Sequence, residues 1–87
     1  MSHMGGDLEQ LGALREVLLR QSGAIEELAS TLRTQLSGTS WHGPAAERFR
    51  AAWTSDFEPS LRRLQSALQE AGTEVGRRRD ALLQAGG

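Results

Sequence analysis

The sequence predicts an all-α fold: an antiparallel hairpin of two long helices that pairs with a second hairpin to form a four-helix bundle dimer. Three observations lead to this prediction. Apolar residues recur every three or four positions over two long stretches. A short segment that ends in Gly43-Pro44 separates the two stretches. Each stretch presents an apolar arc that is too broad for a single neighbouring helix.

The first helix is expected over about residues 7–37. A rotation of about 100° per residue brings its main apolar residues onto one face. These residues are Leu11, Leu14, Leu18, Ile25, Leu28 and Leu32. Charged residues such as Glu9, Glu16 and Glu27 collect on the opposite face. Gly38 follows the apolar pattern, so we expect it to end the helix with a positive φ angle.

The second helix is expected over about residues 44–84. Pro44 suits its first position because the N–H that proline lacks would be unpaired there. The apolar residues of this helix again follow one another at threes and fours. They include Phe49, Trp53, Phe57, Leu61, Leu64, Leu68 and Val75.

The middle of this second helix is expected to be irregular. The spacing of four over residues 49–61 departs from the heptad rhythm and predicts local unwinding. Pro59 lies in the same interval, so the helix either kinks there or restarts. Ser55 and Glu58 have the spacing of a capping box, which would suit a restart. We favour a kinked, nearly continuous helix.

All four aromatic residues lie in or just after the turn, which is expected over residues 38–43. Trp41 lies in the turn itself. Phe49, Trp53 and Phe57 are expected on the inner face of the second helix, where they form an aromatic plug at the turn end of the hairpin. Large rigid rings bury much area per residue, so they suit the closure of a thin hairpin.

A single hairpin leaves a contiguous apolar strip exposed, which soluble monomers rarely tolerate. A second hairpin would cover this strip, and the partner is either a second copy of the chain or a related protein. The residues expected in the hairpin and dimer interface are Leu11, Leu14, Leu18, Ile25, Leu28, Leu32, Leu61, Leu64, Leu68 and Val75.

Length and composition narrow the class of protein. The 87 residues suit one small domain, expected over residues 5–87. Residues 1–4 resemble a leader left by an expression vector, and we expect a disordered N-terminus there. The 10 basic and 11 acidic residues are nearly balanced, which argues against nucleic acid as a partner. No apolar run approaches the roughly 20 residues of a membrane span, and no signal peptide opens the sequence.

Catalysis and metal binding find little support in the sequence. Ser40, His42 and Asp56 invite a nucleophile-and-base hypothesis, but Ser40 and His42 flank a tryptophan in a turn and nothing suggests an oxyanion site. The chain has no cysteine, and one histidine outside the leader does not make a metal-ligand set. We therefore expect a protein that is not an enzyme and has no catalytic residues, no bound metal and no cofactor.

The turn and the residues after it resemble the WXG100 (ESAT-6-like) family. The family motif is matched by Trp41 and Gly43, between two amphipathic stretches in a chain of under a hundred residues. Ala45 and Ala46 follow, and then the three aromatic residues at the spacing common in the family. The tripeptide alone is a weak signal, whereas its combination with length and aromatic spacing is specific. The resemblance covers nearly the whole chain.

The resemblance implies a substrate of a type VII (ESX-type) secretion system. Such proteins are dimeric helical hairpins, secreted effectors or secretion partners that leave the cytoplasm without a cleaved signal peptide. The implied partners are a second copy or a paralogous WXG100-type protein, and the secretion machinery. The chain has no Lys, Asn or Tyr, whose codons are AT-rich. This composition indicates a GC-rich genome such as that of an actinobacterium, which suits the implied host.

One departure from the family concerns the export signal, which is usually Tyr-x-x-x-Asp/Glu after the second helix. This chain has no tyrosine. Three readings remain: a tail was removed, a partner supplies the signal, or the protein is not exported alone. The alternative function is a non-secreted helical adaptor or a companion subunit for a larger secreted toxin or effector.

Overall fold

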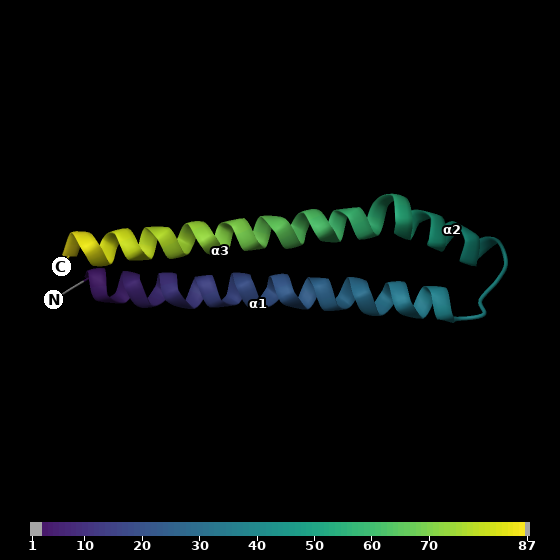
Figure 1. Ribbon diagram of the computed structural model, residues 1–87, viewed down its shortest axis with the longest axis horizontal. Coiled ribbons are helices and arrows are strands. Elements are labelled where there is room, and N and C mark those ends of the chain that lie inside the picture. The colour runs from purple at the N-terminus through teal and green to yellow at the C-terminus, as the bar shows by residue number, and fades with distance from the viewer. Residues whose placement is uncertain (1–2, 87) are drawn as a thin grey trace.

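The computed structural model describes residues 3–86, and the side chains of residues 7–86. Over this range the chain is an all-α hairpin, which confirms the predicted fold class. Its elements in chain order are α1 (His3–Gly38), α2 (Pro44–Ala52), the π-helical turn η1 (Trp53–Phe57) and α3 (Glu58–Gly86). Figure 1 shows two antiparallel arms side by side, α1 in one and the other three elements in the second.

The hairpin is a thin rod that measures 64 × 17 × 15 Å, so it is only one pair of helices thick. α1 begins at His3, four residues before the expected start. The two glycines at positions 5 and 6 are poor helix formers, which is why the sequence predicts a later start. An existing helix nevertheless extends without a new nucleation cost, and this explains the longer helix. Residues 1 and 2, at which we expected a disordered N-terminus, lie outside the described residues.

Small residues line the seam between α1 and α3. Ser22 and Ala29 of α1 are almost completely buried, and Gly72 of α3 is buried too. A Cβ atom on Gly72 would lie 2.7 Å from the Cδ2 atom of Leu19, so a larger side chain would not fit without displacement. The Ser22 hydroxyl donates a hydrogen bond of 3.3 Å to the Gln65 carbonyl oxygen across the seam. The two backbones therefore approach closely, and larger apolar residues lie beside the seam.

The expected irregularity in the second arm is confirmed, and it takes the form of the π turn η1. The Glu58 backbone N–H bonds to the Trp53 carbonyl oxygen, five residues earlier. Proline at position 59 cannot donate to its own i−4 carbonyl, and its ring would clash with that carbonyl in a regular α-helix. A wider π turn relieves this conflict. Ala52 and Glu58, on either side of η1, keep right-handed helical angles, so the arm is continuous and does not restart.

The second arm bows away from α1 around η1 (Figure 1). Trp53 fills the space between the arms there, and only 5% of its surface is exposed. Together with Trp53, a shallow hollow at this level is lined by Arg33 and Leu36 of α1 and by Arg50 of α2. Trp53 is therefore the main apolar side chain that holds the arms together near the turn.

Candidate protein-interaction surface

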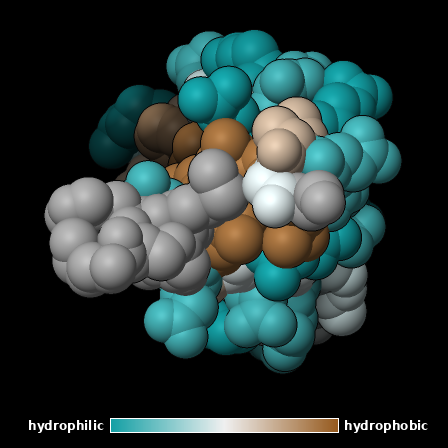
Figure 2. Space-filling view, turned by 90° about the vertical axis from the view of Figure 1, so that its left-hand side faces the viewer, coloured by the Kyte–Doolittle hydropathy of each residue, from teal (hydrophilic) through white to brown (hydrophobic). Residues whose placement is uncertain are grey.

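Large apolar side chains of both arms remain exposed on one side of the hairpin. We call this set the apolar face; its members are each 38–48% exposed. They are Leu14, Val17, Leu28 and Leu32 of α1 with Phe57 of η1 and Leu64 of α3. Figure 2 looks along the rod from the end that carries both termini; at this end hydrophobic residues gather in the middle, with hydrophilic residues above and below.

The helical rotation explains why both arms expose their apolar residues on the same side. Leu28 comes just before the seam residue Ala29, and Leu64 comes just before the seam residue Gln65. One residue is about 100° of rotation, and in an antiparallel pair this rotation leads to the same side of both helices. A further hollow supports this placement, since Leu14 of α1 lines it together with Leu82 of α3. The apolar face is thus continuous across the two arms.

An aromatic row extends this face toward the turn. The ring centroids of Trp41 and Phe49 are 6.2 Å apart, and those of Phe49 and Phe57 are 5.9 Å apart. Eight residues of a regular α-helix would rotate Phe49 by about 80° out of line with Phe57. The π turn between them takes up about one extra residue, so the eight residues make close to two full turns. The row therefore continues the apolar face from α3 to the turn.

The structure separates the ten residues predicted for the hairpin and dimer interface into two groups. Six are partly buried within the hairpin: Leu11, Leu18, Ile25, Leu61, Leu68 and Val75. Four are exposed on the apolar face: Leu14, Leu28, Leu32 and Leu64. The tight seam of small residues accounts for the division, because it leaves no room for all of these side chains between the arms.

The aromatic residues do not share one environment. We expected three of them on the inner face, but only Trp53 is buried between the arms. Phe49 is 38% exposed and Phe57 is 47% exposed, as parts of the aromatic row. Trp41, in the turn, is 40% exposed. The π turn causes the difference, since it directs the central Trp53 to the seam and leaves its two neighbours beside it.

The turn is built differently from the predicted one. Gly38 does not adopt a positive φ angle; it is the last residue of α1. Gly43 has a φ angle of +111°, which favours glycine and leads the chain into Pro44. Arg50 of α2 instead binds one carbonyl group in the last turn of α1, that of Leu36. No periodic pattern singles out this arginine, and its only signal is that it follows the turn by less than two helical turns.

Ser40 and His42 lie together in the turn, with the hydroxyl oxygen 3.2 Å from the His42 Nε2 atom. Both residues are exposed. Asp56 lies in η1, on the second arm. Within the part of the chain that the structure describes, no three His, Cys, Asp or Glu side chains are grouped as a metal site would need. Nor does any helix there have an apolar run long enough to cross a membrane.

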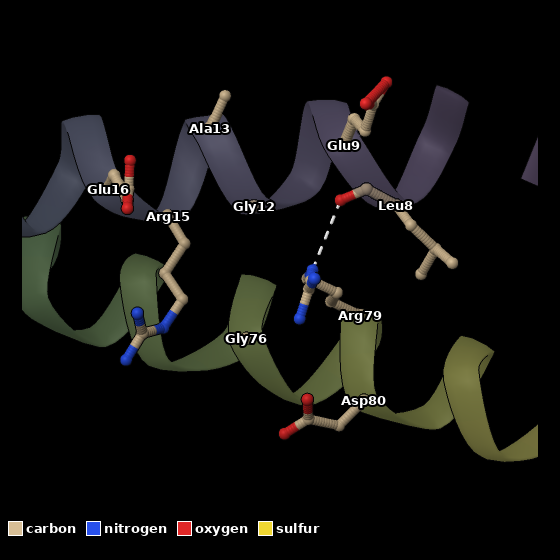
Figure 3. A pocket seen from close by; sticks show the side chains of 9 residues that line it. All are labelled: Leu8, Glu9, Gly12, Ala13, Arg15, Glu16, Gly76, Arg79 and Asp80. Carbon is tan, nitrogen blue, oxygen red and sulfur yellow. Dashed lines mark hydrogen bonds between the residues drawn. The ribbon is translucent and has the colours of Figure 1, made fainter. Parts of the chain in front are cut away.

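The side of the hairpin shown in Figure 3 is polar. Arg79 of α3 lies across Gly12 of α1, and its Nε atom donates a hydrogen bond of 3.3 Å to the Leu8 carbonyl oxygen. Arg15 of α1 lies in the same way across Gly76 of α3. The two glycines thus make room for arginine side chains from the opposite arm. Glu9, Glu16 and Asp80 line the same hollow, whose charges suit contact with water.

Glu58 joins the two arms at the level of η1. Its carboxylate accepts hydrogen bonds from Arg33 of α1 at 2.8 Å and from Arg62 of α3 at 3.2 Å. The hydrogen bond from Arg33 lowers the pKa of Glu58 most strongly. Desolvation is the next largest effect and opposes it, and the charges of Arg33 and Arg62 lower the pKa further, so that the net shift is downward. Glu58 is thus an ionised link between the arms rather than part of a helix cap.

Comparisons with known proteins found no relative of this chain. No protein-family model matches the chain, and no match was found among curated proteins or solved structures. The resemblance to the WXG100 family therefore rests on Trp41, Gly43 and the aromatic spacing that follows them.

Proposed function

We propose that this chain is a non-enzymatic interaction protein that works as a dimer of hairpins, with the apolar face of one copy packed against that of a second copy. The observation that carries the proposal is the apolar face itself, in which six large side chains from both arms are each 38–48% exposed. Soluble monomers rarely expose a contiguous apolar strip of this kind. Two such faces would form a four-helix bundle.

The surface area supports a partner of this size. The chain exposes 6278 Å². A compact monomer of its mass of 9.5 kDa would expose about 5,000 Å². The excess of about 1,200 Å² is comparable with the area that one subunit buries in a stable dimer, which is about 800 Å² or more. The chain thus exposes enough surface beyond that of a compact monomer to form an interface of ordinary size with a second hairpin.

The chemistry of the face is compatible with a second copy. All six members of the apolar face are uncharged, and the two charged residues that line the hollow beside Leu14, Asp7 and Arg78, have opposite signs. The charged residues Glu9, Glu16 and Asp80 line a different hollow and would stay in water. A related hairpin with a similar face would fit as well, and a heterodimer is therefore an outcome that the experiment must separate.

Sedimentation of the purified chain tests the dimer. We expect the wild type to be dimeric at micromolar concentration. Leu28→Glu should weaken the dimer by about 100-fold or more, because two-fold symmetry buries the new charge twice. Ala13→Glu is the matched control, since Ala13 is exposed in the polar hollow of Figure 3, and it should leave the dimer intact. A well-folded wild-type monomer at high micromolar concentration would rule out the homodimer.

The proposal extends to type VII secretion, and what supports it is the match of the turn residues Trp41 and Gly43 to the family motif. In this reading the hairpin is a secreted effector or a secretion partner. Because the chain has no tyrosine, export is best tested with a paralogous partner that carries Tyr-x-x-x-Asp/Glu. In a host with a matching system, the pair should reach the culture filtrate, and Trp41→Ala should abolish its export. No export of the wild-type pair would favour the non-secreted adaptor or companion subunit. Undiminished export of the Trp41 variant would instead rule out Trp41 as part of the export signal.

A further inference from the structure

Arg50 makes an unusual number of contacts for a surface arginine. Its Nε and Nη2 atoms donate hydrogen bonds to the Leu36 carbonyl oxygen at 3.2 and 2.9 Å. Nη2 also donates to the Thr39 carbonyl oxygen at 3.0 Å, and Nη1 donates to that of Trp41. One side chain of the second arm thus binds three carbonyl groups of the α1 end and the turn.

These contacts replace a conventional helix cap. The last four carbonyl groups of a helix lack partners within it, and a glycine with positive φ usually helps to satisfy them. Gly38 does not have this conformation. A guanidinium group presents five N–H donors in a fixed plane, so it can bind several carbonyl groups at once. A lysine has one flexible ammonium group and could not reproduce this arrangement.

The same guanidinium fixes Trp41. Its central carbon lies 5.6 Å from the centroid of the Trp41 ring, in a cation–π contact. The other neighbour of this ring is Phe49, in the aromatic row. Trp41 is therefore held through its backbone carbonyl and through its ring although 40% of its surface is exposed. An exposed aromatic side chain that is already ordered loses less entropy when a partner covers it.

We propose that Arg50 is a positioning residue that fixes Trp41 and the turn in one arrangement before a second hairpin docks on the aromatic row. This inference rests on the proposed dimer, because its purpose is to prepare the end of the apolar face for that partner. The contacts of Arg50 with Trp41, however, are made within one chain. The order of the Trp41 ring depends on Arg50 whether or not a second copy is bound.

The experiment measures Trp41 directly in the isolated chain. In a Trp53→Phe background Trp41 is the single tryptophan, so fluorescence anisotropy decay reports the motion of its ring alone. Arg50→Gln and Arg50→Lys should each increase the amplitude of fast ring motion about twofold or more. Arg48→Gln, two residues away on the exposed surface of α2, is the control and should change nothing. As a second measurement without the Trp53 substitution, the heteronuclear NOE of the Trp41 indole N–H should fall in the Arg50 variants alone.

The dimer provides the second readout. Both Arg50 variants should weaken self-association by about tenfold, since two mobile Trp41 side chains must then become ordered on docking. Unchanged Trp41 motion in both Arg50 variants would overturn the positioning role, and so would an equal effect of Arg48→Gln. Increased motion with undiminished dimer affinity would also overturn it. If the wild type is monomeric, the dimer proposal fails instead, and the motion of Trp41 still decides whether Arg50 holds the turn.

Discussion

Trp53 should contribute more to the stability of the hairpin than any other aromatic residue, because it is the one buried between the arms. A buried tryptophan removes about 200 Å² from water, which corresponds to about 5 kcal/mol at about 25 cal/mol per Å². This value is an upper bound, since the unfolded chain already covers part of the side chain. In a rod one helix pair thick, water also reaches the truncated site. We therefore expect Trp53→Ala to cost about 3 kcal/mol, within the about 3–5 kcal/mol range of such truncations.

Trp53→Phe separates packing from hydrogen bonding at the same position. The Trp53 Nε1 atom is buried and finds no acceptor among the residues that the structure describes. A buried donor without a partner costs about 1–3 kcal/mol. Phenylalanine removes this donor and keeps most of the ring, so the loss of packing and the relief of the unpaired N–H should nearly cancel. We expect Trp53→Phe to change the free energy of unfolding by about 1 kcal/mol or less.

Urea unfolding followed by circular dichroism measures both variants, with Trp41→Ala as the comparison. Trp41 is 40% exposed, so its truncation should cost about half as much as that of Trp53, or about 1–2 kcal/mol. Each variant is measured at two protein concentrations, because the stability of a dimer depends on concentration and that of a monomer does not. If Trp41→Ala destabilises the chain as much as Trp53→Ala at the lower concentration, the assignment of Trp53 as the inner residue is wrong.

Two further pairs of variants test the turn and the link between the arms. Gly38→Ala should raise the free energy of unfolding by about 0.5–1 kcal/mol, because Gly38 is helical with open space around it. Gly43→Ala should lower the free energy of unfolding by about 1–3 kcal/mol, because the φ angle of Gly43 is +111°. Urea unfolding measures both variants. If Gly38→Ala were the less stable of the two, the description of the turn would be wrong. Glu58→Gln should destabilise the chain at neutral pH. The difference in stability from the wild type should vanish as the pH falls through the pKa of Glu58, which is lowered from the ordinary value of about 4.3. Glu74→Gln is the control in thermal melts across this pH range, because the Glu74–Arg77 pair is exposed within one helix, and it should change little at any pH.

The two helices, the turn and the irregular interval could be predicted because each has a local signal. Apolar spacing of three and four residues defines the arms, and Gly43-Pro44 marks the start of the second arm. The interval around Pro59 combines a spacing of fours with a residue that cannot donate a backbone hydrogen bond. Such signals depend only on residues that are close in sequence, so they can be recognised without knowledge of the fold.

The division between seam and apolar face could not be predicted in the same way. The sequence places Leu28 and Ala29 next to each other, and hydrophobicity alone favours the leucine as the inner residue. The structure buries Ala29 and exposes 47% of Leu28. The close approach of the backbones along this seam depends on the other arm, where Gly72 lies against Leu19 and the Gln65 carbonyl oxygen accepts a hydrogen bond from Ser22. Which of two adjacent residues faces the partner helix thus depends on residues more than thirty positions away.

The cap of α1 illustrates the same limit. Gly38 satisfies the local rule for a helix end, and the rule alone predicts a positive φ angle. Arg50 binds the Leu36 and Thr39 carbonyl oxygens from the second arm, so the glycine conformation is not required. A side chain from a distant element can replace a local cap only when the fold brings it to the helix end.

The π turn connects the predictable and the unpredictable parts of this molecule. Phe49, Trp53 and Phe57 are spaced by four, which in a regular helix would spread them over about 80° and give each a different neighbour. Proline at position 59 makes a wider turn favourable just before it, and the extra residue is absorbed between Trp53 and Phe57. Phe49 and Phe57 then meet at 5.9 Å on the exposed side, while Trp53 lies between the arms. The π turn therefore also produces the aromatic row. As a consequence, a single stretch of sequence supplies both the inner contact of the hairpin and the end of its apolar face.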